Sequence, residues 1–93
     1  MSKQEKTEAR IVRCQRLIVL GIIAQKAGDA DEEARYLALY EREFAKLPHV
    51  HQLIPVHEHE VAQPVQQMFN RHGVLGMRER AVAEDWTAEF AEQ

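Results

Sequence analysis

The first quarter of the chain places apolar residues at the period of an α-helix. They recur every three or four positions between residues 5 and 27, at Ile11, Cys14, Ile18 and Ile22. Such spacing marks one face of a helix. Further along, from Leu17 to Ala24, apolar residues occupy the remaining sides as well. The pattern therefore predicts a helix over about residues 5–27 that is amphipathic at its start and apolar nearly all round at its end.

A second amphipathic pattern follows a glycine. Gly28 stands where a left-handed residue commonly ends a helix, and Asp29 or Asp31 suits the N-cap of the next one. This second helix is expected over about residues 31–47, before Pro48. Its inward stripe is predicted to comprise Tyr36, Leu37, Tyr40, Phe44 and Leu47. Two helices joined by a short turn make an antiparallel αα-hairpin, here about residues 5–47.

The periodic signal weakens from about residue 48 to residue 63, which we interpret as a linker. Pro55 and Pro64 each disfavour helix at the residue before them. A third helix is expected from Pro64 to His72, ended by Gly73. The alternative is a helix that begins near Glu58 and kinks at Pro64.

A fourth helix is expected over about residues 77–91, with Val82, Trp86 and Phe90 facing inward. No strand pattern of useful length appears along the chain. The sequence thus predicts one all-α domain over residues 1–93. We expect a small helical bundle of about four helices, built on the hairpin, with the C-terminal helices at about residues 64–91.

The net charge of −3 conceals an uneven distribution of charged residues. Basic residues recur along one face of the first predicted helix, at Lys3, Lys6, Arg10, Arg13 and Arg16, whereas residues 29–43 contain six acids. The simplest interpretation is long-range pairing of these charges, within the fold or between subunits. The alternative is a nucleic-acid-binding regulator that contacts phosphates through Lys6, Arg10 and Arg13. The acidic balance and the absence of aromatic residues from the stripe disfavour that partner.

Four histidines lie close together in the predicted linker, at His49, His51, His57 and His59, with Glu58 and Glu60 beside them. Imidazole and carboxylate groups could hold Zn²⁺ or Ni²⁺. Residues two apart lie on opposite sides of a helix, so this spacing favours a metal site only in an extended segment. The competing interpretation is a polar connection whose histidines face water.

Catalytic chemistry finds no support in the sequence. The one cysteine, Cys14, shares a face with Ile11 and Ile18, which predicts a buried, inert thiol. No glycine-rich phosphate loop is present. The apolar run at residues 17–24 is far shorter than the roughly 20 residues of a membrane span. We therefore expect a cytoplasmic, non-enzymatic protein with neither a required cofactor nor a membrane partner.

The apolar second half of the first helix carries the functional prediction. A helix that is apolar on every side needs cover on every side. Either the later helices of the same chain supply that cover, or some of the surface binds a partner. On the second interpretation, Leu17, Val19, Leu20 and Ile23 form a protein-binding face. The predicted function is a small regulatory module that acts through helix-mediated protein contacts and forms a homo-oligomer.

Overall fold

The structure is a computed structural model that describes residues 2–48 and 58–91, with the backbone alone for Glu58 and His59. The described residues form α1 (Lys3–Lys26), α2 (Ala30–Ala45), the π-helical turn η2 (Glu58–Ala62), α4 (Gln63–Ala83) and α5 (Trp86–Glu89). No strand occurs among them. The predicted all-α bundle is confirmed.

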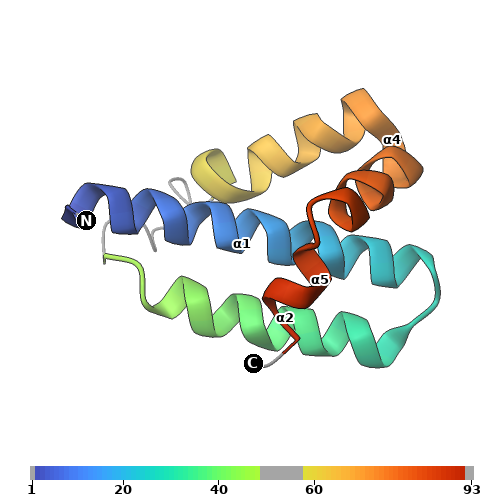
Figure 1. Cartoon of the computed structure of the whole chain (residues 1–93), viewed down its shortest axis with the longest axis horizontal. Helices are drawn as coiled ribbons and strands as arrows, with labels where there is room; N and C mark the ends of the chain where they lie inside the picture. Colours follow the sequence, from blue (N-terminus) through green and yellow to red (C-terminus); the bar gives the residue numbers. More distant parts are fainter. Residues whose placement is uncertain (1, 49–57, 92–93) are drawn as a thin grey trace.

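The helical hairpin forms as expected, because each of its ends has a local signal. Ser2 caps α1, its hydroxyl accepting a hydrogen bond from the Glu5 amide at 3.2 Å. Gly28 takes the left-handed conformation after α1, with φ of 77°. The Asp29 carboxylate then caps α2 by accepting from the Glu32 amide at 3.1 Å. The two helices run antiparallel beside each other (Figure 1).

The third helical region begins earlier than Pro64. The turn η2 runs directly into α4, and Pro64 lies in the first turn of α4. The alternative with a start near Glu58 is thus closer to the structure than the helix predicted to begin at Pro64. Gly73 interrupts α4 with φ of 73° and ψ of 173°, as expected of the residue predicted to end a helix. The first half of α4 lies along α1 on the side away from α2 (Figure 1).

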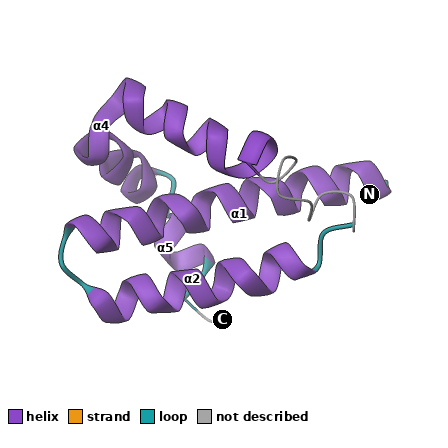
Figure 2. Ribbon diagram, turned by 180° about the vertical axis from the view of Figure 1, so that it is seen from behind, coloured by secondary structure: helices purple, strands orange, loops and turns teal. Residues whose placement is uncertain are grey.

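The C-terminal helix lies across one side of the hairpin. Asp85, with φ of 58° in the left-handed region, separates α4 from the four-residue α5. From the front, α5 crosses over the space between α1 and α2, and from behind it lies beyond them (Figures 1 and 2). Trp86 and Phe90 are both buried. They close this side of the core.

Helix α1 is central and supplies most of the core. The main buried cluster unites residues of α1, α2, α4 and α5: Leu17, Val19, Leu20, Ala24, Tyr36, Leu39, Val65, Met77, Ala81, Trp86 and Phe90. A smaller cluster near the start of α1 contains Cys14, Leu47 and Val61. The apolar sides of α1 are therefore buried largely by the other helices of the same chain.

The predicted inward stripe of α2 is wrong at one position. Leu37 is 54% exposed, whereas Leu39, which the stripe omitted, is buried. The reason is that α5 packs on the hairpin as well as α1, so the buried face of α2 turns toward both. Leu39 belongs to the same buried cluster as Trp86 and Phe90.

The predicted inward face of the last helix also needs correction. Val82 is 70% exposed, and Met77 and Ala81 are buried instead. The prediction treated Val82, Trp86 and Phe90 as one continuous face. The left-handed Asp85 breaks the helix between them, so the face of α4 and the face of α5 no longer share a helical phase.

Candidate protein-binding groove

The residues predicted to bind a partner lie mainly inside the molecule. Leu17, Val19 and Leu20 are at most 4% exposed, and the half-buried Ile23 packs against the same core. They are covered by the chain's own α2, α4 and α5. A partner that contacts this half of α1 must therefore use the side of the helix that these elements leave open.

That open side forms an apolar groove between α1 and α2. The groove has a volume of about 210 Å³, and its lining residues come from both helices of the hairpin: Leu17, Ile18, Gly21, Ile22, Gln25, Glu33, Leu37 and Tyr40. Of the side chains around it, Leu37 is the most exposed large hydrophobic one. Gly21 contributes no side chain to the floor.

The groove and helix α5 occupy opposite sides of the hairpin. Ile18 lines the groove, whereas Arg16, two residues earlier, pairs with Glu89 at the end of α5. Two residues correspond to about 200° around a helix. On α2, Leu37 lines the groove, whereas Arg35 donates a hydrogen bond to the Phe90 carbonyl at 3.0 Å. Figure 2 views the hairpin from the side away from α5.

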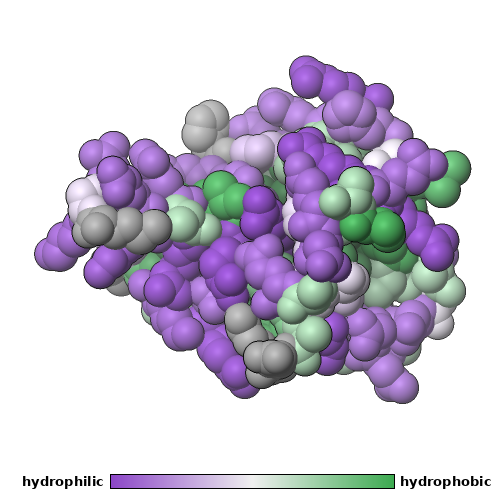
Figure 3. Space-filling view, viewed as in Figure 1, coloured by the Kyte–Doolittle hydropathy of each residue, from purple (hydrophilic) through white to green (hydrophobic). Residues whose placement is uncertain are grey.

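The opposite face, shown in Figure 3, is mostly hydrophilic over the first half of α1 and over α2. Its apolar atoms gather over the second half of α1 and the kinked part of α4. Leu75 of α4 is 67% exposed, and Val82 of the same helix is 70% exposed. Neither residue lines the groove.

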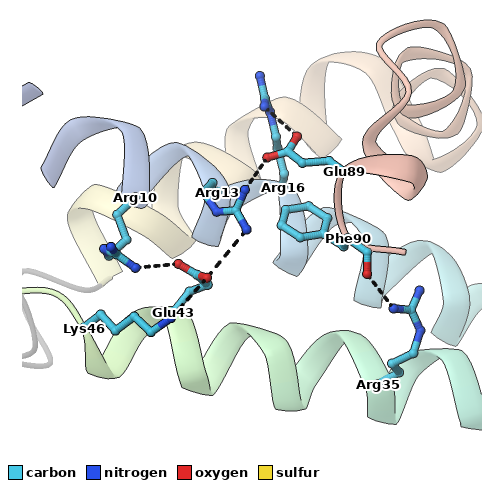
Figure 4. Close-up of polar contacts among 8 residues, drawn as sticks. All are labelled: Arg10, Arg13, Arg16, Arg35, Glu43, Lys46, Glu89 and Phe90. Carbon is cyan, nitrogen blue, oxygen red and sulfur yellow. Dashed lines mark hydrogen bonds and ion pairs between the residues drawn. The ribbon is translucent and has the colours of Figure 1, made fainter. Parts of the chain in front are cut away.

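The basic stripe of α1 pairs with acids from distant parts of the chain, as the simplest interpretation of the charge pattern predicted. Arg10 lies 2.8 Å from Glu43 of α2, and Arg13 lies 3.6 Å from the same carboxylate. Arg13 and Arg16 also hold Glu89 of α5, at 3.1 Å and 2.9 Å. Figure 4 shows these side chains converging on one side of the hairpin.

Stacking supports the same array. The Arg13 guanidinium lies 4.9 Å from the centre of the Phe90 ring, and that of Arg16 lies 5.5 Å from the Trp86 ring. Such cation–π contacts stabilise by roughly 0.5–2 kcal/mol each. The arginines therefore hold α5 against the hairpin by both charge and stacking. The indole N–H of Trp86 is buried without an acceptor among the described residues.

The three residues proposed for nucleic-acid contact differ in their surroundings. Arg10 and Arg13 are engaged by Glu43, while Lys6 is exposed. Together with Ala9 and Lys46 these residues line an open hollow of about 360 Å³. Glu43 is the one acid lining it within the described chain, and its side chain is only 6% exposed. Glu89, outside the hollow, also pairs with Arg13, so the hollow keeps an excess of about two positive charges.

The predicted metal ligands cannot be placed. His49, His51 and His57 lie outside the described residues, and of His59 only the backbone, in η2, is described. Within the described part of the chain no group of three or more histidine, cysteine or acidic residues gathers around a point. The zinc or nickel site stays a prediction.

The environment of Cys14 fits the inert thiol predicted from its position. Burial first, and then the negative charge of Glu43, raise the pKa of Cys14 to about 11. Nucleophilic cysteines have a lowered pKa instead. None of the helices in the described part of the chain is long and apolar enough to span a bilayer.

The sequence prediction missed the groove because it assigned Leu37 to the core, and it missed Glu43 because a carboxylate is a rare buried residue. A signal for Glu43 existed, since it lies between Tyr40 and Leu47 on the apolar side of α2. Comparison of the chain with protein-family models, curated proteins and solved structures finds no match.

Proposed function

We propose that this chain is a non-enzymatic protein-binding module of the cytoplasm that forms a homodimer through the α1–α2 groove. The observation that carries the proposal is the exposure of Leu37 beside the hollow between Ile18, Gly21 and Ile22. Burying a leucine side chain contributes about 1.5–3 kcal/mol when it was fully exposed before. An apolar side chain next to an apolar hollow is thus a source of binding energy.

The shape of the surface favours a second copy as the partner. A twofold symmetric interface uses the same patch on both subunits, so the patch must contain both a projection and a hollow that accepts it. The groove has both, since Leu37 projects at its edge and Gly21 lies in its floor. A twofold axis across the groove would place Leu37 of each copy in the hollow of the other.

The charges near the groove agree with an antiparallel arrangement. Glu33 is the one charged residue among the described residues that line it, and it lies toward the Gly28 turn, near Gln25. A twofold axis through the middle of the groove puts the two Glu33 carboxylates at opposite ends of the interface. Like charges are then separated, and the central part of the interface is apolar.

The substitution Leu37→Glu tests the proposal. Leu37 is more than half exposed, so the change should leave helicity unchanged while it places two buried carboxylates in the dimer. We expect the dimer dissociation constant to rise by at least about 100-fold, equivalent to about 2.7 kcal/mol. Sedimentation equilibrium at several protein concentrations measures it, with circular dichroism as the check on folding.

The matched control is Leu75→Glu. It makes the same chemical change at a somewhat more exposed leucine that does not line the groove, and the dimer should persist. A wild-type protein that is monomeric up to about 1 mM, where the binding free energy is only about −4 kcal/mol, would overturn the proposal. Equal weakening by both substitutions would show that the groove is not the interface.

A further inference from the structure

We infer that the basic hollow at the start of the hairpin binds the acidic Asp29–Glu33 turn of a second copy of this chain. The hollow is the one lined by Lys6, Ala9, Arg10, Arg13, Glu43 and Lys46. The hollow lies on the side of the hairpin that carries α5, away from the groove. The acidic turn includes Glu33, which lines the groove, so the contact is tested in a chain whose groove is blocked.

The first step of the inference is the charge left over in the hollow. The buried carboxylate of Glu43 is within 4 Å of Arg10, Arg13 and Lys46, and Lys6 adds a fourth cation at the rim. Glu43, with Glu89 on Arg13, cannot balance four cations. In a chain whose net charge is −3, such a local excess of positive charge attracts an anionic group.

The second step is the chemistry that this array accepts. Glu43 and Glu89 show that its arginines hold carboxylate oxygens, at distances from 2.8 to 3.6 Å. The two arginines of the hollow, Arg10 and Arg13, are held in place by these acids, and Arg13 also stacks on the Phe90 ring. A further carboxylate therefore meets donors that are already ordered, which lowers the entropy cost of binding.

The third step identifies the source of the carboxylates. The N-cap and first turn of α2, next to the Gly28 turn, contain four acids in five residues, namely Asp29, Asp31, Glu32 and Glu33. Asp29 and Asp31 are exposed. From Lys6 to Gly28 the rise along α1 is about 33 Å, so the turn cannot reach the hollow of its own molecule. It can reach the hollow of a neighbour.

This contact joins two different surfaces, so it is heterologous and can repeat from one molecule to the next. Because both surfaces are exposed, salt should weaken it. The Debye length falls from about 30 Å at 0.01 M salt to about 10 Å at 0.1 M. Head-to-tail association is thus expected at low salt, with an average mass that grows with protein concentration.

The test uses the full-length Leu37→Glu chain, in which the groove is blocked. Sedimentation velocity at about 0.01 M salt should detect species larger than the monomer, which disappear at about 0.3 M. The double substitution Lys6→Glu/Lys46→Glu should abolish them. Lys46 makes the longest of the three contacts with Glu43, at 3.9 Å, whereas Arg10 and Arg13 keep their shorter ones, and circular dichroism checks that the variant folds. The control Arg71→Glu/Arg78→Glu changes the net charge equally on exposed positions of α4 and should retain association.

A mixing experiment sharpens the test. Asp31→Lys/Glu32→Lys alters the turn but leaves the hollow intact, and Lys6→Glu/Lys46→Glu does the reverse. Both double variants are made in the Leu37→Glu chain, so each alone should be monomeric at low salt, whereas an equimolar mixture should form a one-to-one complex. Monomers in the mixture would overturn the inference.

Three other outcomes would also reject it. Low-salt association that survives Lys6→Glu/Lys46→Glu would place the contact elsewhere. Binding of a single-stranded oligonucleotide that depends on Lys6 and Lys46, without self-association, would show that the hollow takes phosphates and not the acidic turn. A monomeric parent at low salt rejects the head-to-tail contact but leaves the groove dimer untouched, since the groove is blocked in that variant.

Discussion

Glu43 shows how one residue determines the arrangement of its neighbours. Its carboxylate is almost fully buried at a position of α2 that the helical period assigns to the core. Burial of a carboxylate is unfavourable unless cations and hydrogen bonds compensate. Arg10 donates to it at 2.8 Å, and Arg13 and Lys46 lie within 4 Å. The first half of α1 is thereby tied to the end of α2.

Replacing Glu43 with glutamine should lower the free energy of unfolding by about 1–3 kcal/mol. The glutamine side chain has nearly the same volume as that of glutamate, but it leaves Arg10 and Arg13 without a charged acceptor. The cost stays below that of a fully buried pair because Arg10 and Arg13 are about one-third exposed. Urea unfolding measures it. The same change at Glu41, exposed on the same helix, should alter stability by less than about 0.5 kcal/mol.

At the scale of elements, α4 and α5 depend on two backbone positions more than on helix propensity. Gly73 has φ of 73° with an extended ψ, a combination that side chains disfavour strongly. Asp85 has φ of 58° and separates the two helices. These bends direct Met77, Ala81 and then Trp86 and Phe90 onto the hairpin.

The substitution Gly73→Ala should therefore lower the free energy of unfolding by about 1–3 kcal/mol through backbone strain. Nothing lies within 4 Å of the added methyl group, so a clash would not explain the loss. Gly21→Ala is the matched comparison. Gly21 is helical and its new methyl would meet the Tyr36 side chain at an ordinary 3.9 Å, so stability should rise by up to about 1 kcal/mol. Urea unfolding of both variants in the Leu37→Glu chain, where the groove around Gly21 makes no dimer contact, distinguishes strain from loss of glycine.

At the scale of the whole molecule, Cys14 reports on the packing of three elements. It shares a buried cluster with Leu47, after α2, and Val61 of η2. The neutral thiol fits this site, and the raised pKa of about 11 reflects the cost of ionising it there. Ionisation and opening of the fold are therefore coupled.

This coupling predicts a loss of stability in base. The folded pKa of Cys14 lies above its ordinary value of 9.0. The stabilisation is accordingly complete below about pH 9 and is lost as the pH rises toward 11. We expect the wild type to lose about 1–2 kcal/mol more than Cys14→Ala across that window. The same dependence of unfolding free energy on pH in both proteins would contradict the assignment. Chemical labelling of the Cys14 thiol at pH 8 should occur only as fast as the whole protein unfolds.

The sequence by itself determined the features that depend on neighbouring residues. The hairpin helices begin and end within two residues of their predicted bounds, because Gly28, Asp29 and Pro48 act locally on the backbone. The apolar period along α1 likewise predicted the burial of Cys14. A helical period and a cap need no knowledge of distant elements.

Only the tertiary structure decided which faces those elements bury. Leu37 is exposed and Leu39 is buried, because α5 packs against one side of α2 and the groove lies on the other side. The acids that pair with the basic stripe are equally distant in sequence. Glu43 lies 33 positions from Arg10, and Glu89 lies 76 positions from Arg13. Such distances are set by how whole helices pack, and local pattern carries no information about them.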